Sequence, residues 1–352
     1  MEYPSELVKK LGKPGIIQTV NGVPVECKAV PDGPANALDP RELKRQQENG
    51  GTWDPNASLQ EQRDRMGGFN YNLNRKEIWI KYLLVPTSCG DVPVWCYYPR
   101  RMGTARPALV YVHGGGFFGG SVYTVENQCR LIAERADCSV WNVDYSLAPQ
   151  HPYPTACIQV YEMIRHLFDH AAQYNVAQNS IMVAGDSAGG NIAAVAAQMD
   201  RDRGTNYVAG QVLIYAKLAF TSYGLPGYVW DEHMFRIVDE QKHMLKDLLA
   251  LGTDAANKQC AANYVQGREE LCAPYVSPAF GKAEGLAKTL MIQAEYDGLR
   301  LEGEFYARKL LNAGVPVRMV RYCGTAHAFF DGLGILPQAE AAVNEIADFL
   351  QM

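Results

Sequence analysis

The sequence lacks the features that mark membrane, secreted and nucleic-acid-binding proteins. Its first residues have no apolar core of the signal-peptide kind, and no uncharged apolar run is long enough to span a bilayer. Basic residues form no block, and 33 Lys and Arg against 38 Asp and Glu give a net charge of −5. We therefore expect a soluble cytoplasmic protein that binds neither nucleic acid nor a membrane.

The sequence also lacks any cysteine pattern with a chemical meaning. Its nine cysteines are odd in number and scattered, without a C-x-x-C pair or a zinc-ligand spacing. We expect reduced, half-buried thiols and predict no metal or other cofactor. The chain is nevertheless large: 352 residues with 47% hydrophobic content suffice for one large α/β domain with an accessory lobe, or for two domains.

Most of the chain alternates between strand and helix patterns. Apolar runs predict buried strands at residues 107–112, 139–143, 181–184, 210–215, 289–294 and 317–322. Helical patterns occupy residues 125–136, 155–172, 187–199 and 302–312, with a C-terminal helix from about residue 338. A hairpin at residues 77–84 and 92–98 opens the sheet. Such alternation is typical of a mostly parallel sheet with helices on both faces.

Two stretches interrupt this alternation. Residues 1–76 are rich in proline, glycine, asparagine and charge, so we expect no regular sheet there, only broken helical patterns such as residues 57–65. The second stretch is helical and irregular. We predict an N-terminal cap segment at residues 1–76, a core at residues 77–216 and 277–352, and a cap insertion at residues 217–276. Together the two stretches would form a lid over the carboxyl edge of the sheet, where open α/β sheets bind ligands.

The apolar run at residues 181–184 ends in a glycine-flanked serine, in the sequence Gly185-Asp186-Ser187-Ala188-Gly189-Gly190. Strand, tight turn and helix with G-x-S-x-G form a nucleophile elbow, which lifts the serine hydroxyl clear of the backbone. Glycine two residues to either side is a steric requirement of so sharp a turn. By itself the pattern also fits a turn that holds a phosphate, so other residues must decide between the two.

A nucleophilic serine needs a histidine to take its proton and an acid to fix the histidine tautomer. After an elbow the order along the chain is serine, acid, histidine. Asp297 follows the strand at residues 289–294, and His327 follows the strand at residues 317–322 as the only histidine C-terminal to Asp297. Glu295 is a rival acid, but its position at the strand end favours contact with a neighbouring loop.

A glycine run provides a place for negative charge. His113-Gly114-Gly115-Gly116 follows the strand at residues 107–112, so its N–H groups can face a substrate with no side chain between them. Together with the N–H of Ala188, this run provides three donors to an oxyanion. We expect His113 to be structural and hydrogen-bonded to backbone, since it precedes the elbow.

Aromatic residues near these segments are candidates for the wall of a substrate pocket. They are Phe117, Phe118, Trp230 and Phe329. Aromatic bulk would favour short acyl groups, and the alternative is that some of these rings only pack the lid onto the sheet.

These segments resemble the hormone-sensitive-lipase-like (family IV) carboxylesterases of the α/β-hydrolase superfamily. The resemblance rests on the H-G-G-G motif at residues 113–116 and the G-D-S-A-G-G elbow at residues 185–190. It implies an α/β-hydrolase fold with a helical cap, Ser187 as nucleophile, Asp297 as acid and His327 as base. It also implies that the N–H groups of Gly115, Gly116 and Ala188 are the oxyanion donors. The chain departs from the family pattern at Ser146, Gln150, Gly298 and Ala328, which replace Arg, Glu, Pro and Gly respectively.

We therefore expect a serine carboxylesterase that hydrolyses small esters with acetyl to butyryl acyl groups. Its expected partner is a small-molecule ester, and a homodimer stays an open alternative. The same scaffold could instead serve as a non-catalytic receptor for a small ligand. An amidase or peptidase would use the same three residues.

Overall fold

The computed structural model describes residues 2–31, 33–48, 57–99 and 105–352. They contain a ten-stranded sheet with the order β1-β2-β10-β9-β8-β7-β5-β6-β4-β3. Every neighbouring pair from β2 to β6 in this order is parallel, whereas β1, β4 and β3 attach by antiparallel pairing. The strands are β1 Ile16–Val20, β2 Val23–Lys28, β3 Ile78–Val85, β4 Val92–Pro99, β5 Arg106–Val112, β6 Ser139–Val143, β7 Val176–Asp186, β8 Gly210–Ile214, β9 Lys288–Tyr296 and β10 Val317–Ala326.

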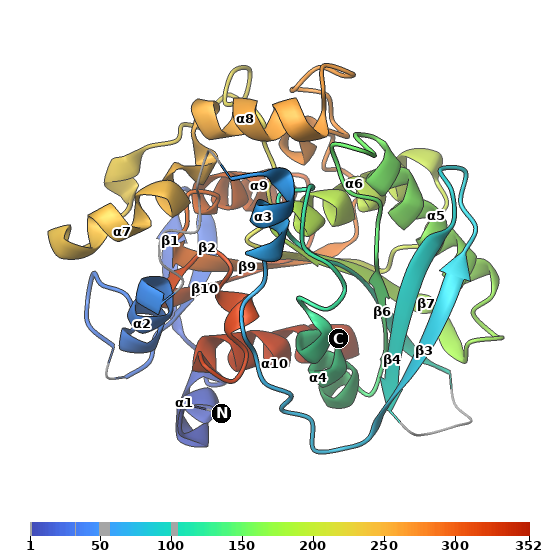
Figure 1. Ribbon diagram of the computed structural model, residues 1–352, viewed down its shortest axis with the longest axis horizontal. Coiled ribbons are helices and arrows are strands. Elements are labelled where there is room, and N and C mark those ends of the chain that lie inside the picture. The colour runs from blue at the N-terminus through green and yellow to red at the C-terminus, as the bar shows by residue number, and fades with distance from the viewer. Residues whose placement is uncertain (1, 32, 49–56, 100–104) are drawn as a thin grey trace.

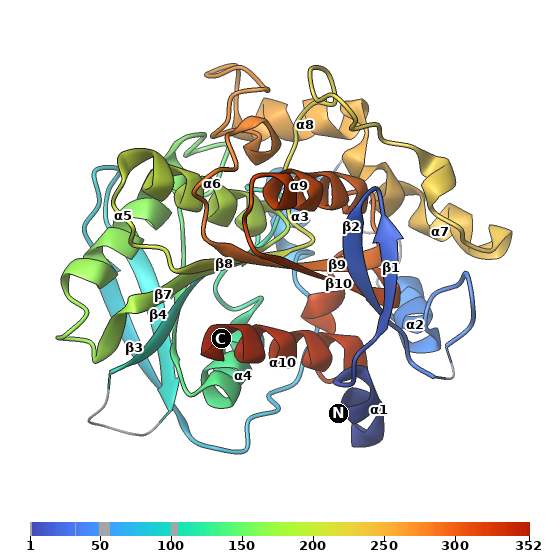
Figure 2. The ribbon, with the colours of Figure 1, turned by 180° about the vertical axis from the view of Figure 1, so that it is seen from behind.

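Helices cover both faces of this sheet, which confirms the predicted architecture (Figures 1 and 2). α4 and α10 lie on one face, whereas α5, α6 and α9 lie on the other. The helices are α1 Ser5–Leu11, α2 Pro40–Glu48, α3 Leu59–Asp64, α4 Glu126–Ala136, α5 Thr155–Asp169, α6 Ala188–Arg203, α7 Asp239–Leu249, α8 Asp254–Tyr264, α9 Arg300–Asn312 and α10 Pro337–Gln351.

The apolar run of β5 shows why these strands read as continuous hydrophobic sequence. Successive side chains of a strand point to opposite faces of the sheet. Val110 and Val112 therefore pack in the core beneath α5 and α6, whereas Leu109 and Tyr111 pack in the core beneath α4 and α10. Both faces are buried, so no polar alternation is needed.

The expectation of no regular sheet within residues 1–76 is wrong. β1 and β2 form a hairpin, and β2 pairs in parallel with β10. The turn of the β1–β2 hairpin is Asn21-Gly22, and both residues have positive φ angles, of 50° and 83°. This two-residue turn is a strong hairpin signal between β-branched residues, but it was outweighed by the many prolines and glycines around it.

Residues 36–38 of the N-terminal segment meet the insertion at the carboxyl ends of β9 and β10. Residues 217–278, all within the described part of the chain, form α7, α8 and short 3₁₀ turns but no strand. A small apolar cluster joins the two stretches to the strand ends; its buried members are Leu38, Ile237, Leu245, Tyr296 and Ala326. Hydrogen bonds from Leu38 N to Gln241 Oε1 (2.8 Å) and from Val238 N to Asn36 O (2.9 Å) reinforce it.

A buried ion network fastens β2 to the core. Lys28 Nζ bonds to Glu345 of α10, and their side chains are only 2% and 6% exposed. Arg318 of β10 also pairs with Glu345 at 2.6 Å. If one partner of a buried ion pair is removed, the remaining charge stays in a medium that solvates it poorly.

We predict that Lys28→Ala lowers the free energy of unfolding by about 3 kcal/mol, as measured by urea denaturation. The matched control is Lys9→Ala in α1, because Lys9 forms an exposed pair with Glu6 (68% and 66% exposed side chains). Exposed pairs contribute little, so the control should leave stability unchanged. Equal effects of the two substitutions would contradict the placement of β2 in the core.

Candidate active site

Ser187 lies in a strained turn between β7 and α6. Its φ and ψ are 53° and −117°, in a region that L residues rarely occupy. The flanking glycines allow the turn: a Cβ at Gly185 would overlap the carbonyl oxygen of Gly189, and a Cβ at Gly189 would overlap that of Val112. The steric requirement predicted for the elbow is confirmed.

The structure brings Ser187, His327 and Asp297 into one hydrogen-bonded line. Ser187 Oγ lies 3.0 Å from His327 Nε2, and His327 Nδ1 lies 2.7 Å from Asp297 Oδ2. Asp297 follows β9 and His327 follows β10, so neighbouring strands deliver the acid and the histidine to the same sheet edge. Since a carboxylate can only accept, Nδ1 carries the proton and Nε2 is free to accept the serine hydroxyl.

The electrostatic environment keeps His327 basic. Burial by itself lowers the pKa of His327, but the charge of Asp297 and its hydrogen bond raise it above the ordinary value of 6.5, with further contributions from Asp186 and Asp331. Burial also raises the pKa of the Asp186 carboxyl, and the Asp331 charge adds to that rise.

Asp186 ties the elbow to the glycine run. Its Oδ1 accepts hydrogen bonds from Tyr111 Oη and from the Gly114 N–H, both at 3.0 Å. The next N–H groups are free: within the described residues, those of Gly115, Gly116 and Ala188 have no hydrogen-bond partner. Gly115 and Gly116 have positive φ angles, of 121° and 59°. We call residues 114–120 the oxyanion turn.

His113 is part of the scaffold, as expected. Its Nδ1 lies 2.8 Å from Gly114 O, and its ring stacks on Tyr145 with centroids 4.4 Å apart. Burial lowers the pKa of His113 to about 4. The ring is therefore neutral at physiological pH.

The loop after β9, which carries Asp297, is hydrogen-bonded to α7 of the insertion. Glu295 Oε2 accepts the Gly324 N–H at 2.8 Å, in the irregular stretch of the adjacent strand β10, so it contacts a strand rather than the loop predicted for it. The Gly298 N–H donates to Leu248 O of α7 at 3.1 Å. A Cβ at Gly298 would overlap the carbonyl oxygen of Leu249, so the glycine that replaces the family's proline lets α7 pack against the loop that carries Asp297.

The four predicted pocket rings lie in four different surroundings. Phe329 is fully buried and packs on Tyr215 and Tyr322 in the core beneath α10 (centroids 5.6 and 5.4 Å), so its prediction as a pocket wall is wrong. Phe117 stacks on Tyr264 of α8 at 3.9 Å, which matches the alternative that rings pack the lid onto the sheet. Phe118 lies against the oxyanion turn, since a Cβ at Gly116 would come within 2.9 Å of its ring.

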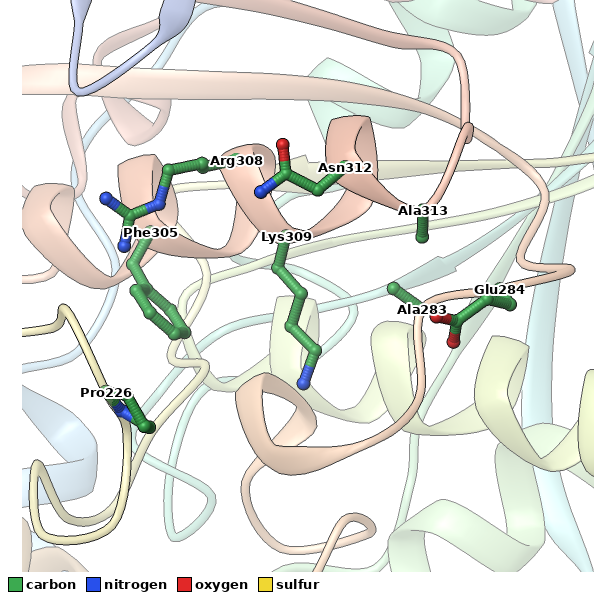
Figure 3. A pocket seen from close by; sticks show the side chains of 8 residues that line it. All are labelled: Pro226, Ala283, Glu284, Phe305, Arg308, Lys309, Asn312 and Ala313. Atoms are coloured by element: carbon green, nitrogen blue, oxygen red, sulfur yellow. The ribbon is translucent and has the colours of Figure 1, made fainter.

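Trp230 lies in the insertion, where it lines a pocket of about 200 Å³ with Tyr228 and Gly252. A larger pocket, of about 370 Å³, is shown in Figure 3; Phe305, Arg308, Lys309 and Asn312 of α9 form one wall of it. Ser187 lines neither pocket.

Sequence reasoning missed two residues that contact this site. The Tyr215 ring lies 4.9 Å from the His327 ring. Its position directly after the strand beside the elbow strand is the signal that could have found it. Arg63 of α3 donates to Phe118 O in the oxyanion turn, and nothing in its local sequence indicates this contact.

The described residues contain no cluster of His, Cys, Asp and Glu that could hold a metal ion. Among them there is also no helix long and apolar enough to cross a membrane.

Comparisons with known proteins agree with this geometry. A family model for the alpha/beta hydrolase fold matches residues 109–331. Esterase LipI of Mycobacterium tuberculosis is 32% identical over 273 residues, which are 76% of this chain and 80% of LipI. The esterase of Pyrobaculum calidifontis has a TM-score of 0.74 and 31% identity, over 89% of this chain and 98% of its own. The thermophilic carboxylesterase EstE1, cloned from a metagenomic library, has a TM-score of 0.73 and 30% identity, over 85% and 98%.

The chain therefore belongs to the α/β-hydrolase fold family, which confirms the predicted fold class. Within that family it is one of the hormone-sensitive-lipase-like (family IV) carboxylesterases, and so a carboxylic ester hydrolase.

We predict that NMR titration of labelled histidine places the pKa of His327 above 6.5 and that of His113 near 4. In Asp297→Asn the pKa of His327 should fall, because the largest of the charges that oppose the effect of burial is removed. His113 serves as the internal control and should not move. An unchanged His327 in this variant would show that Asp297 does not set its pKa.

Proposed function

We propose that this carboxylesterase works through an acyl-enzyme on Ser187, with His327 as general base and Asp297 as the acid that orients it. The observation that carries the proposal is the hydrogen-bonded line from Ser187 Oγ through His327 to Asp297, with contacts of 3.0 and 2.7 Å. The free N–H groups of the oxyanion turn support it. A receptor would need neither feature.

In the first half of the reaction His327 Nε2 takes the proton of Ser187 as Oγ attacks the ester carbonyl. Negative charge then develops on the carbonyl oxygen. The N–H groups of Gly115, Gly116 and Ala188 are the donors that would stabilise it, and one such donor typically contributes roughly 10²- to 10³-fold in rate. His327 next protonates the leaving alcohol, which leaves the acyl group on Ser187.

In the second half, water enters where the alcohol departed. His327 removes its proton, the resulting hydroxide attacks the acyl carbonyl, and the same donors hold the second oxyanion. His327 returns the proton to Ser187 Oγ as the carboxylic acid product leaves. Asp297 keeps Nδ1 protonated throughout, so Nε2 is always the atom that exchanges protons.

We also propose a preference for short acyl groups, from acetyl to butyryl. The carbonyl oxygen must face Gly115 and Gly116, so the acyl chain starts beside the Phe118 ring that lies against Gly116. The neighbouring residue Phe117 belongs to a buried aromatic group with Phe220 and Tyr264, at centroid distances of 5.7 and 3.9 Å. This packing supports a shallow acyl site.

We predict that Ser187→Ala lowers kcat for a p-nitrophenyl ester by roughly 10⁵-fold or more and abolishes labelling by a fluorophosphonate probe. Turnover that persists in the alanine variant would overturn the assignment. Turnover of a matched anilide at the rate of the ester would favour the amidase alternative.

The kcat/KM of the wild type should rise with pH through the pKa of His327, because only the neutral ring can take the serine proton.

We predict that kcat/KM across p-nitrophenyl esters of rising chain length is highest between acetyl and butyryl. Phe118→Ala should shift the maximum toward longer chains, because it removes the ring beside the acyl group. Exposed Tyr223→Ala in the insertion is the control and should leave the profile unchanged. A maximum at twelve carbons or longer in the wild type would rule out a short acyl site.

A further inference from the structure

Arg63 of α3 reaches from the N-terminal segment to the oxyanion turn. Its Nε donates to Phe118 O at 2.6 Å. Its Nη2 donates to Ala148 O at 3.0 Å and to Gln150 Oε1 at 2.8 Å. The half-buried guanidinium thus donates to three oxygens on two loops. The acceptors Phe118 and Ala148 lie 30 residues apart in the sequence.

The first of these loops is the oxyanion turn, and the second is the loop that contains Ala148 and Gln150. The Ala148 N–H donates to Phe117 O at 3.0 Å, so the second loop is hydrogen-bonded to the turn itself. Within the turn, Gly115 O accepts the N–H groups of Phe118 and Gly119 at 3.1 and 2.9 Å. The carbonyl that Arg63 holds therefore belongs to a residue whose N–H bonds directly to Gly115.

A second contact from the same segment fixes the turn sterically. Met66, which follows α3, lies so close to Gly119 that a Cβ there would overlap its sulfur atom. The segment after α3 thus covers the far end of the turn, while the guanidinium of Arg63 holds its middle. A planar guanidinium suits this task, because its donors have fixed directions and can serve several acceptors at once.

We propose that Arg63 is a positioning residue that holds the oxyanion turn in the conformation in which Gly115 and Gly116 can donate to the oxyanion. The proposal rests on the role proposed above for those two N–H groups. The hydrogen bonds of Arg63 go to Phe118, Ala148 and Gln150 and not to Ser187, so we expect it to act on the rate through the geometry of the turn. A displaced N–H donor stabilises the oxyanion less, since this stabilisation depends on donors that are fixed in place before the reaction.

The test compares Arg63→Ala and Arg63→Lys with Arg65→Ala, which removes an exposed arginine just past the same helix. We expect Arg63→Ala to lower kcat for p-nitrophenyl acetate by about 10- to 100-fold, with KM changed by less than about threefold. The inhibition constant of a trifluoromethyl ketone, whose hemiketal oxyanion occupies the donor site, should rise by the same factor as kcat/KM falls.

Two further readouts separate positioning from stability alone. Added guanidinium ion should restore part of the activity of Arg63→Ala, whereas Arg63→Lys should restore little, since one ammonium cannot bridge both loops. Arg65→Ala should match the wild type in every measurement. Thermal unfolding is recorded for each variant, and the Lys variant carries the test if the Ala variant does not fold.

The proposal is overturned if Arg63→Ala and Arg63→Lys raise KM at constant kcat, or leave the affinity for the trifluoromethyl ketone unchanged. Failure of the proposed function has a different signature. In that case Ser187→Ala, assayed in parallel, retains the ester turnover of the wild type whatever Arg63 does.

Discussion

The site depends on how closely helix α6 approaches the ends of β5 and β7. Gly189 leaves no room for a side chain between the helix and the carbonyl groups of Val112 and His113. This contact forces the turn that gives Ser187 its positive φ of 53°. It also brings the free N–H of Ala188 beside the segment that carries Gly115 and Gly116, so one steric constraint arranges both the proposed nucleophile and the proposed anion site.

The acid and the histidine depend on a different constraint, which is the packing of the two non-core stretches. The apolar cluster around Leu38 and Leu245 includes Tyr296 and Ala326, each next to one of the two functional side chains. The Asp39 N–H donates to Gly324 O at 2.9 Å, and the Gly298 N–H donates to α7. The N-terminal segment therefore bears on all three parts of the site: through Leu38 and Asp39 at the loops of the acid and base, and through Arg63 at the oxyanion turn.

Local sequence patterns predict the buried strands and the order of the three site residues. They do not reveal features that depend on contacts between distant parts of the chain. Buried strands such as Ser139–Val143 are continuous apolar runs, and the order of serine, aspartate and histidine follows from strand order in this kind of sheet. The Asn21-Gly22 hairpin was recognisable from its turn, yet the surrounding composition concealed it. Phe329 lies two residues after His327 but packs in the core beneath α4 and α10, because the chain enters a 3₁₀ turn at Phe329. The contact of Arg63 joins positions 55 residues apart, and no local pattern records it.

The central claim is that Ser187 carries the acyl group during turnover. Acid quenching of the enzyme with p-nitrophenyl acetate in the steady state, followed by mass spectrometry of its peptides, tests this directly. We expect an acetyl group on the peptide that contains Ser187, more abundant in a variant that slows deacylation, and absent from Ser187→Ala. An acetyl group on another residue at kinetically competent levels, or ester turnover with no acyl-enzyme and undiminished in Ser187→Ala, would contradict it.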